Sequence, residues 1–496
     1  MKYIKYTIIL LILTCQFSGS FGQKITGQKT GKYLQEVKND ILLPGEEIPN
    51  ITQLLKNDDQ IIALSPGKIF YFKNEKWSTK TINNEWHTTV LDPVGKLWLG
   101  NPNKIVNIET NQKIDFQKIN AKDTVFCMFW ESERILHLGT SQGFWTWNGS
   151  WKQLPGTEGI GVKQIAKGIN NDIWLACSNG IFRRRDNEWI NLDDFVMAPG
   201  LKRGYVSIAK GASPGDVIFG NAISVAQISE EGNHWTYTKE DGLPYGPATT
   251  ICYSNNELWL GTPKGAIKKD KRWHYYHGKR WLPDNKINDI LRIDPYTVWI
   301  ATPKGISEIK NVEMTLTQKS KRFNQRLNDR HIHHGFVADC RFDSPGDTTT
   351  AKCYTSDNDG LWTSIYLASE SFRYAVTGAQ DAYDNAVRTF KAMERLETIN
   401  PIPGFVARSY VKIDETTGRG GEWHVSQDGK WKWKADTSSD EIVGHMFAYP
   451  IFYELVAKGE IKERCRNLVH RLMTHIVDNN YNLIDLDGKP TRWGVW

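Results

Sequence analysis

The phrase ELWLGTPKGAIKKDKRWHYY, at Glu257–Tyr276, is followed 40 residues later by the similar phrase TVWIATPKGISEIK, at Thr297–Lys310. Both copies contain an apolar run, the turn sequence Thr-Pro-Lys-Gly and a second run of apolar and polar residues. Short apolar runs separated by turn residues predict a pair of β-strands. A phrase that returns at a fixed spacing indicates a repeat architecture.

Five weaker copies of the phrase precede these two. Anchored on the second residue of each apolar pair, the seven copies lie at Leu64, Leu99, Leu138, Leu175, Phe219, Leu260 and Ile300. About 40 residues and four strands per repeat are typical of propeller blades, which close into a ring without exposed sheet edges. The sequence therefore predicts an all-β seven-bladed β-propeller over residues 41–312, with residues 23–40 as an N-terminal linker.

The motif LWLGT at 258–262, the downstream Trp273 and the sequence EDGLP at Glu240–Pro244 resemble the two-component regulator propeller repeat. The resemblance covers a little over half of the chain. It implies a propeller of bacterial exported sensor-type proteins, a family in which hybrid histidine kinases detect oligosaccharides. We find no kinase sequence, no second propeller and no later membrane span in the chain, so the resemblance does not support a sensor-kinase role.

The N-terminus predicts export. Lys2 and Lys5 precede a short apolar stretch and a run of small residues that ends at Gly22. This pattern is typical of a secretory signal peptide over residues 1–22, and its apolar part is too short to span a bilayer. Cys15 offers an alternative interpretation as a lipid-anchor cysteine. We expect an exported protein that is periplasmic, associated with the outer membrane or secreted, with no transmembrane span once the signal is removed.

The net charge limits the classes of partner that the chain is expected to bind. The formal net charge is +6 over 496 residues, which is mild, so we expect no nucleic-acid partner for an exported chain. A basic and aromatic surface would instead suit a polysaccharide or oligosaccharide.

Cys340 and Cys353 lie close enough in sequence to pair in an oxidising compartment, and the alternative of two free thiols stays open.

Helical periodicity replaces the strand repeats after residue 313. Two helical hairpins are expected at Asp359–Ile399 and Asp440–Asn480, and their starts and their turn glycines, Gly378 and Gly459, are each 81 residues apart. The long loop between the hairpins, from Pro401 to Ser439, is typical of a functional lid or binding loop. The sequence predicts an all-α helical domain over residues 313–496, similar to part of an α/α-toroid hydrolase or lyase that acts on polysaccharides and incomplete at the C-terminus.

Acidic residues at the predicted helix starts are the candidate catalytic groups. Glycoside cleavage requires one carboxyl as an acid and a second as base or nucleophile, and Asp359 with Asp440 or Glu441 would supply that pair. His445 lies four residues after Glu441, on the same helix face, where it would serve as a base in lyase chemistry. The alternative is structural: an acid at a helix start caps free N–H groups and suits the helix dipole.

Candidate binding residues lie in the loops. Arg408 and Arg492 would neutralise a uronate carboxylate, and Trp423, Trp431, Trp433 and Trp493 would stack on sugar rings or stabilise a hairpin. His331 and His333 share one face of an extended segment and form half of a metal site, without an obvious third ligand. We therefore expect no cofactor, with a divalent metal or calcium left open.

Two classes of function remain from the sequence. The first is an exported carbohydrate-active enzyme, a glycoside hydrolase or polysaccharide lyase, whose propeller binds substrate or acts as a scaffold. The second is a non-catalytic ligand-binding sensor or regulatory protein. The first predicts that Asp440 and Glu441 reach a cleft, and the second predicts that polar and aromatic residues gather at the propeller mouth.

Overall fold

The repeated phrase forms two adjacent antiparallel strands, β23 (Glu257–Thr262) and β24 (Gly265–Lys269). The Thr262 hydroxyl donates a 2.7 Å hydrogen bond to the carbonyl of Gly265 and so closes the turn. Gly265 has a φ of +148°, and a Cβ atom there would lie 2.5 Å from the carbonyl oxygen of Tyr276. The turn sequence thus specifies the hairpin, because only glycine tolerates this positive φ and leaves room for the carbonyl oxygen of Tyr276.

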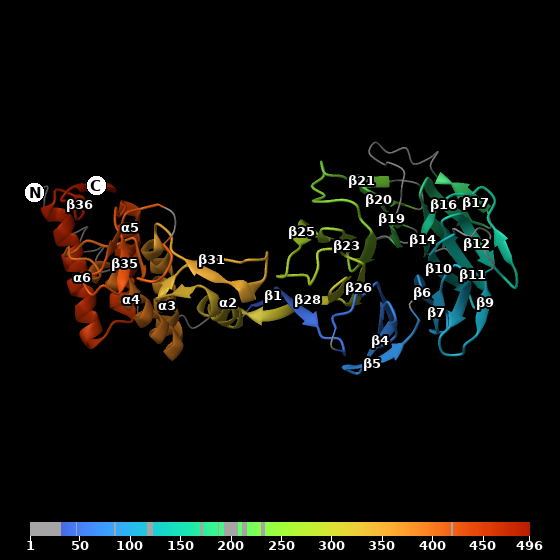
Figure 1. Cartoon of the computed structure of the whole chain (residues 1–496), viewed down its shortest axis with the longest axis horizontal. Helices are drawn as coiled ribbons and strands as arrows, with labels where there is room; N and C mark the ends of the chain where they lie inside the picture. The colour runs from blue at the N-terminus through green and yellow to red at the C-terminus, as the bar shows by residue number, and fades with distance from the viewer. Residues whose placement is uncertain are drawn as a thin grey trace, which may run out of the picture. The chain divides into compact units, whose positions relative to one another are not determined.

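A computed structural model describes residues 31–496 except 46, 84–85, 117–122, 169–171, 187, 193–206, 211–215, 230–233 and 418–419 (Figure 1). The described residues fall into two compact units. The propeller unit comprises Leu34–Glu313 with Ser344–Thr348, and the helical unit includes Met314–Asp343 and Thr349–Trp496. The expected signal peptide, residues 1–22, and Cys15 lie outside the described residues.

Seven four-stranded antiparallel sheets make up the described part of the propeller unit. In six of them the strands follow chain order: β2–β5 (Gln53–Asn57, Gln60–Ser65, Lys68–Lys73, Lys76–Thr81), β6–β9 (Thr88–Leu91, Leu97–Gly100, Lys104–Asn107, Lys113–Asp115), β10–β13 (Val125–Ser132, Ile135–Thr140, Gly143–Trp147, Trp151–Gln153), β14–β17 (Val162–Lys167, Ile173–Cys177, Gly180–Arg185, Glu188–Asn191), β18–β21 (Ser207–Lys210, Val217–Gly220, Val225–Ile228, His234–Tyr237) and β22–β25 (Thr250–Ser254, Glu257–Thr262, Gly265–Lys269, Trp273–Tyr276). The first strands of successive sheets contact one another, and β26 (Asp289–Asp294) of the last sheet contacts β2. These sheets fit a β-propeller.

The last sheet joins the two ends of the propeller sequence. Its order is β1 (Lys32–Ile41), β28 (Gly305–Thr315), β27 (Thr297–Thr302) and β26, so an N-terminal strand completes a sheet made of C-terminal repeats. The expected linker over residues 23–40 is therefore wrong from residue 32 onward. The reason is physical: β1 is an outermost strand with mostly exposed or half-buried residues, so it lacks the apolar run that reveals the inner strands.

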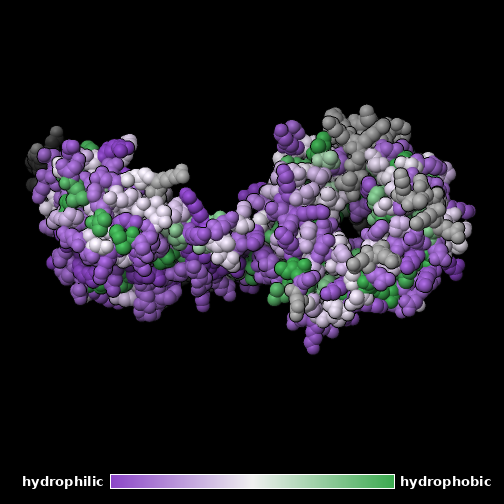
Figure 2. Space-filling model, in the orientation of Figure 1, coloured by the Kyte–Doolittle hydropathy of each residue, from purple (hydrophilic) through white to green (hydrophobic). Residues whose placement is uncertain are grey.

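Burial explains the repeated apolar anchors. All seven are between 0 and 7 % exposed: Leu64, Leu99, Leu138, Leu175, Phe219, Leu260 and Ile300. Six of them lie in the second strand of their sheet, and Ile300 lies in β27, next to β26. These strands are buried on both faces and so read as continuous apolar runs. The visible face of the molecule is mostly hydrophilic, with small and separate apolar spots (Figure 2).

The helical unit contains the two predicted hairpins. The first consists of α3 (Asp359–Thr377) and α4 (Gln380–Thr398), with Gly378 left-handed at the turn, and the second consists of α5 (Ser439–Leu455) and α6 (Gly459–Asp478). Helix α3 contacts α5, and α4 contacts α5 and α6, so the hairpins share one core. Helix α2 (Leu316–Arg330) precedes them. None of the helices among the described residues is long and apolar enough to cross a membrane.

Short strands fill the connections of the helical unit. They are β29 (Ile332–His333) with β30 (Phe336–Val337), β31 (Asp339–Arg341) with β32 (Lys352–Tyr354), the sheet of β33 (Ser409–Lys412), β35 (Trp431–Lys434) and β34 (Trp423–Val425), and β36 (Asn482–Ile484) with β37 (Pro490–Val495). A short 3-10 helix, η2 (Thr348–Thr350), precedes β32. The long loop expected between the hairpins thus contains a three-stranded sheet, in which β34 and β35 pair as a hairpin.

We expect a disulfide between Cys340 and Cys353 in an oxidising compartment. The two residues are direct partners on β31 and β32, and their sulfur atoms lie 3.1 Å apart as free thiols. Directly opposed residues of an antiparallel pair have the Cα separation that a disulfide needs. Mass spectrometry of unreduced, exported protein should show one linked peptide pair, which Cys340→Ser abolishes and Cys252→Ser preserves. Two alkylatable thiols in that material would contradict the expectation.

Candidate functional site

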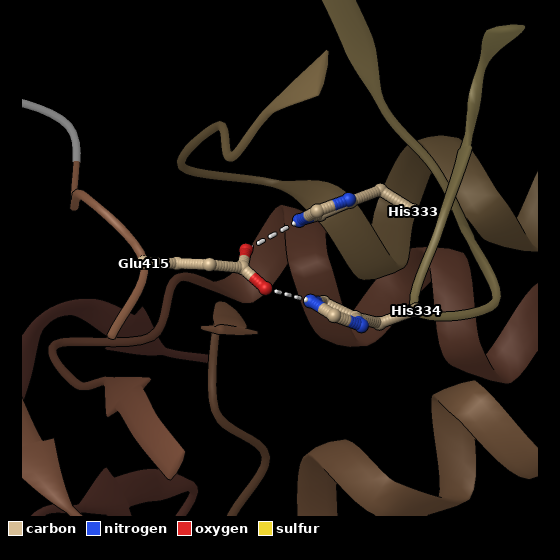
Figure 3. Close-up of side chains that lie close together, drawn as sticks. All are labelled: His333, His334 and Glu415. Carbon is tan, nitrogen blue, oxygen red and sulfur yellow. Dashed lines mark hydrogen bonds and ion pairs between the residues drawn. The ribbon is translucent and has the colours of Figure 1, made fainter. Parts of the chain in front are cut away.

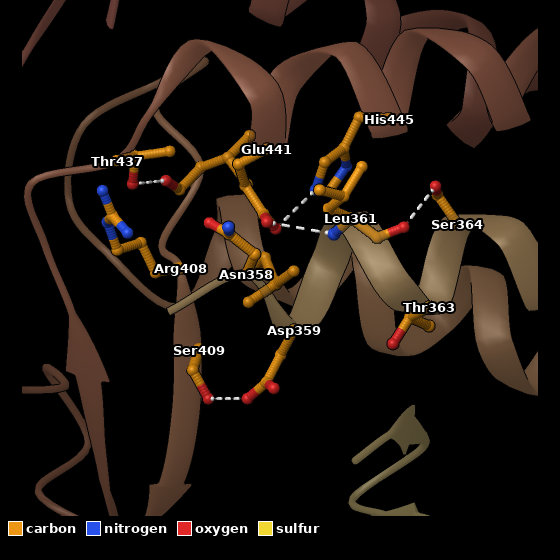
Figure 4. A network of polar contacts seen from close by, with 12 residues as sticks. Asn358, Asp359, Leu361, Thr363, Ser364, Arg408, Ser409, Thr437, Glu441 and His445 are labelled. Atoms are coloured by element: carbon orange, nitrogen blue, oxygen red, sulfur yellow. Dashed lines mark hydrogen bonds and ion pairs between the residues drawn. The ribbon is translucent and has the colours of Figure 1, made fainter. Parts of the chain in front are cut away.

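Asp359 lies at the start of α3 and is 1 % exposed (Figure 4). Its Oδ1 accepts hydrogen bonds from the backbone N–H and the hydroxyl of Ser356, at 3.0 and 2.7 Å, and its Oδ2 accepts from the Ser409 hydroxyl at 2.5 Å. Both carboxyl oxygens are therefore occupied by protein donors. The interaction fixes the start of α3 against β33.

Glu441, in the first turn of α5, caps the other helix. Its Oε2 accepts a 3.0 Å hydrogen bond from the Leu361 N–H, one of the free donors in the first turn of α3. Its Oε1 lies 3.3 Å from His445 Nε2, and His445 Nδ1 lies 2.6 Å from the hydroxyl of Tyr449 (Figure 4). Glu441, His445 and Tyr449 recur every four residues along α5, and none of them is exposed to solvent. They form a buried polar row that joins α5 to α3.

Glycine allows the two helices to approach this closely. A Cβ atom on Gly360 would lie 1.9 Å from Glu441 Oε1 and 2.6 Å from His445 Nε2. The glycine of the sequence DNDG, which spans the start of α3, therefore reflects a packing requirement. With backbone and side chains in contact here, Glu441 and His445 do not reach a cleft.

Burial shifts the protonation of these groups. Burial raises the pKa of Asp359 to about 6, although hydrogen bonds from Ser409 and Ser356 act in the opposite direction. Burial also raises the pKa of Glu441, while its contact with His445 acts to lower it. A raised carboxyl pKa is common in catalytic acids, but here its cause is enclosure by protein.

The remaining acid and arginine candidates lie around this network. Asp440 is exposed and accepts a 3.0 Å hydrogen bond from the Asn358 side chain. Arg408 is buried, and it donates from Nε to the carbonyl of Asp436 at 2.5 Å and from Nη1 to the carbonyl of Asp357 at 3.0 Å. Arg408 thus holds the two segments that lead into α3 and α5.

The four predicted tryptophans lie in four different environments. Trp433 is 1 % exposed and belongs to the core shared by the hairpins. Trp423 is half-buried beneath the Lys434 ammonium, which lies 5.8 Å from its ring centre. Trp493 is exposed, next to Arg492, whose Nη2 lies 3.7 Å from an Asp436 carboxylate oxygen; Trp431 lines a pocket. The structure therefore does not bring these residues together at one site.

The pocket beside Trp431 has a volume of about 710 Å³ and is walled by one face of α4. That face presents Arg388, Lys391 and Arg395, at positions i, i+3 and i+7 of the helix. The other sides come from the turn between β29 and β30, from β33, from β35 and from α6. Sequence reasoning missed this pocket, and its one local signal was the basic repeat along the predicted helix.

Arg395 lines the pocket and packs against two aromatic residues that also line it, Trp431 and Tyr410. Its guanidinium carbon lies 4.4 Å from the ring centre of Trp431 and 5.3 Å from that of Tyr410, a cation–π arrangement. Its buried Nε has no hydrogen-bond partner among the described residues. Arg464, also on the wall, is paired with Glu394 instead. The wall carries four basic and two acidic side chains, so its formal charge is positive.

A second, smaller pocket of about 440 Å³ lies in the propeller unit. Its lining is polar or aliphatic: Asn50, Thr52, Thr249, Pro263, Lys286, Ile287, Asn288 and Pro303. Among the described residues that line it, none is aromatic.

The predicted half-site for metal is rearranged. His331 Nδ1 lies 3.2 Å from the carbonyl of Ala338, on the neighbouring strand connection, and does not join His333. His333 instead lies beside His334 and Glu415. The expectation that His331 and His333 share one face of an extended segment is therefore wrong, because His331 is the C-cap residue of α2 and the strand begins only at Ile332.

The chain is similar to several solved structures at low sequence identity. No family model matches the chain, and no curated protein matches it. Among solved structures, the extracellular domain of BT4673 from B. thetaiotaomicron, described as a hybrid two component system, is 19% identical with a TM-score of 0.45. The match covers 56% of this chain and 40% of that chain.

Other solved structures match the same share of the chain. Virginiamycin B lyase from Staphylococcus aureus is 13% identical with a TM-score of 0.46, and the match covers 56% of this chain and all of that one. The WD40 propeller domain of Doa1 is 12% identical with a TM-score of 0.42, covering 56% of this chain and 96% of that one.

The raised pKa of Asp359 predicts a pH-dependent stability. The folded protein holds this proton more tightly than the unfolded chain, whose carboxyl has a pKa of 3.8. The stabilisation is therefore complete below that value and is lost as the pH rises through about 6. At 1.36 kcal/mol per pKa unit, the shift amounts to about 3 kcal/mol over the full titration, and the free energy of unfolding of wild type relative to Asp359→Asn should fall by about 2 kcal/mol between about pH 4 and pH 7.

Asp381→Asn provides the control for this measurement. The Arg373 side chain lowers the pKa of Asp381, so removal of that carboxyl should change the pH dependence with the opposite sign. Urea unfolding of wild type and both variants over this pH range would measure the slopes. A difference between wild type and Asp359→Asn that does not vary with pH would contradict the expected titration.

Proposed function

We propose that the chain is an exported ligand-binding protein of the sensor type, which recognises an acidic oligosaccharide in the pocket beside α4. In this proposal the seven sheets are the blades of one seven-bladed propeller that supports a toroid-like helical unit. The observation that carries the proposal is the pocket wall itself: Trp431 and Tyr410 beside Arg388, Lys391 and Arg395.

The chemistry of the wall suits a sugar that bears carboxylate or sulfate groups. Aromatic side chains offer apolar faces for sugar rings, and arginine presents a planar set of donors to carboxylates. Arg395 is already oriented by its cation–π contacts with Trp431 and Tyr410. A preoriented side chain loses little entropy on binding, which favours affinity.

Binding is favoured over cleavage by the position of the predicted catalytic groups. A carboxyl acts on a glycosidic bond only if it contacts the bond, and the Asp359 and Glu441 carboxyls are enclosed by protein donors. Asp440 is exposed, but the 710 Å³ pocket is lined by other residues. The resemblance of the repeat to sensor-type propellers also favours binding over cleavage.

Titration calorimetry of the full mature chain with oligouronates and with neutral oligosaccharides of equal length tests the proposal. We expect binding of the acidic series, weakened by salt. Arg388→Gln and Lys391→Gln should each weaken it about tenfold, equivalent to about 1.4 kcal/mol, because each removes a charge that faces the pocket. Arg466→Gln is the matched control, since Arg466 is an exposed helical arginine that does not line the pocket.

Equal affinity for neutral and acidic sugars, or equal losses in all three variants, would contradict the proposed pocket. The same incubations distinguish an enzyme. New reducing ends, or absorbance of unsaturated uronates, that disappear in Glu441→Gln would establish cleavage and replace the binding proposal.

A further inference from the structure

Two neighbouring histidines point in the same direction because of the turn between β29 and β30. In a regular strand, adjacent side chains project to opposite faces. Here His334 has a φ of +50° and Gly335 a φ of +95°, which makes a tight two-residue hairpin turn. The imidazole rings of His333 and His334 consequently lie with their centres 4.1 Å apart.

Helix α4 holds this turn in place through a close contact at Gly335. A Cβ atom on Gly335 would lie 2.7 Å from Cβ of Ala392 in α4, so the hairpin packs directly on this helix. A left-handed conformation at a residue other than glycine costs on the order of 1 kcal/mol and persists where the surroundings impose it. Backbone strain of this kind is common at functional sites.

Both rings converge on one carboxylate from a distant part of the chain (Figure 3). His333 Nε2 lies 2.8 Å from Glu415 Oε2, and His334 Nε2 lies 2.7 Å from Glu415 Oε1. Glu415 follows β33, and its backbone is fixed by a 2.7 Å hydrogen bond from the Lys432 ammonium to its carbonyl oxygen. All three side chains are half-buried.

We propose that His333, His334 and Glu415 bind a single first-row divalent metal ion of the Zn²⁺ type. One ligand atom from each residue lies within 4.8 Å of the others, a spacing that an ion with ligands at about 2.0–2.2 Å can bridge after small side-chain rotations. Two imidazoles and one carboxylate are ligands that such ions prefer, and they leave positions free for water or another ligand.

The alternative is an ion pair without metal, and the other histidines of the chain provide the comparison. His137, His274, His424 and His445 each contact a single carboxylate as separate pairs. Among the described residues, only this cluster brings two histidines and a carboxylate together in a metal-binding arrangement. An ion pair needs only one histidine and one carboxylate. Two imidazoles that share one carboxylate supply the three ligands of a metal site.

The proposed site lies at the edge of the basic pocket, because His334 is also one of the residues that line it. An ion held there would add positive charge beside Arg395 and Lys391. The metal site goes beyond the proposed function and does not depend on it, since ion binding is measured without any sugar.

Zn²⁺ titration of the full, tag-free chain after chelator treatment and dialysis tests the site. We use a Cys340→Ser/Cys353→Ser background, because these neighbouring thiols could bind zinc themselves. We expect one ion per chain, by calorimetry and by elemental analysis. Glu415→Gln and His334→Asn should each weaken binding at least tenfold, because each removes a ligand.

Glu422→Gln is the matched control, since it breaks the exposed pair of Glu422 with His424 in the same unit and should leave zinc binding unchanged. Substitution with Co²⁺ gives a second readout, a visible spectrum of a nitrogen- and oxygen-ligated ion that is lost in His333→Asn. Circular dichroism verifies that the variants remain folded. Absence of zinc uptake, or uptake that is equal in wild type and Glu415→Gln, would overturn the proposal.

Discussion

The buried carboxylate of Glu441 is the constraint on which the helical unit depends. A charge or acid enclosed in protein is costly unless it is hydrogen-bonded, and Glu441 finds its partners in the Leu361 N–H and His445. These contacts fix the starts of α5 and α3 against each other. Because α3 continues into α4, the same interaction sets the position of the helix that walls the basic pocket.

The structure separates two roles that the sequence had combined. Asp359, Glu441 and His445 have the residue types and the perturbed protonation of a catalytic site, yet their surroundings are those of a buried polar network. The pocket, by contrast, is built from residues whose types alone are ordinary for a helix surface. Perturbed pKa values accompany both functional sites and structural networks, and exposure distinguishes the two.

The turn at His334 and Gly335 links the pocket to the proposed metal site. It packs on α4 through Gly335, and it presents His334 both to the pocket and to Glu415. A single local conformation thereby connects a helix face, a three-stranded sheet and a strained histidine. The basic wall and the proposed ion would act on the same anionic ligand.

The sequence by itself determined the repeating sheets and the helical hairpins. Period and turn chemistry are local, so Leu260 and Thr262 are enough to specify a buried strand and the turn that follows it. Local patterns missed β1, because an outermost strand has no apolar run. They also could not tell Trp431, which lines the pocket, from Trp433, which lies in the core.

Tertiary structure alone decided the sites. Glu415 is 82 residues from His333 in sequence, and Leu361 is 80 residues from Glu441, so no spacing rule connects them. The pocket gathers residues from α4, α6, two strands and a hairpin turn. Such contacts form when the chain packs its apolar core, and the core fixes which polar groups meet; sequence patterns report only the periodicity that makes each element fit that core.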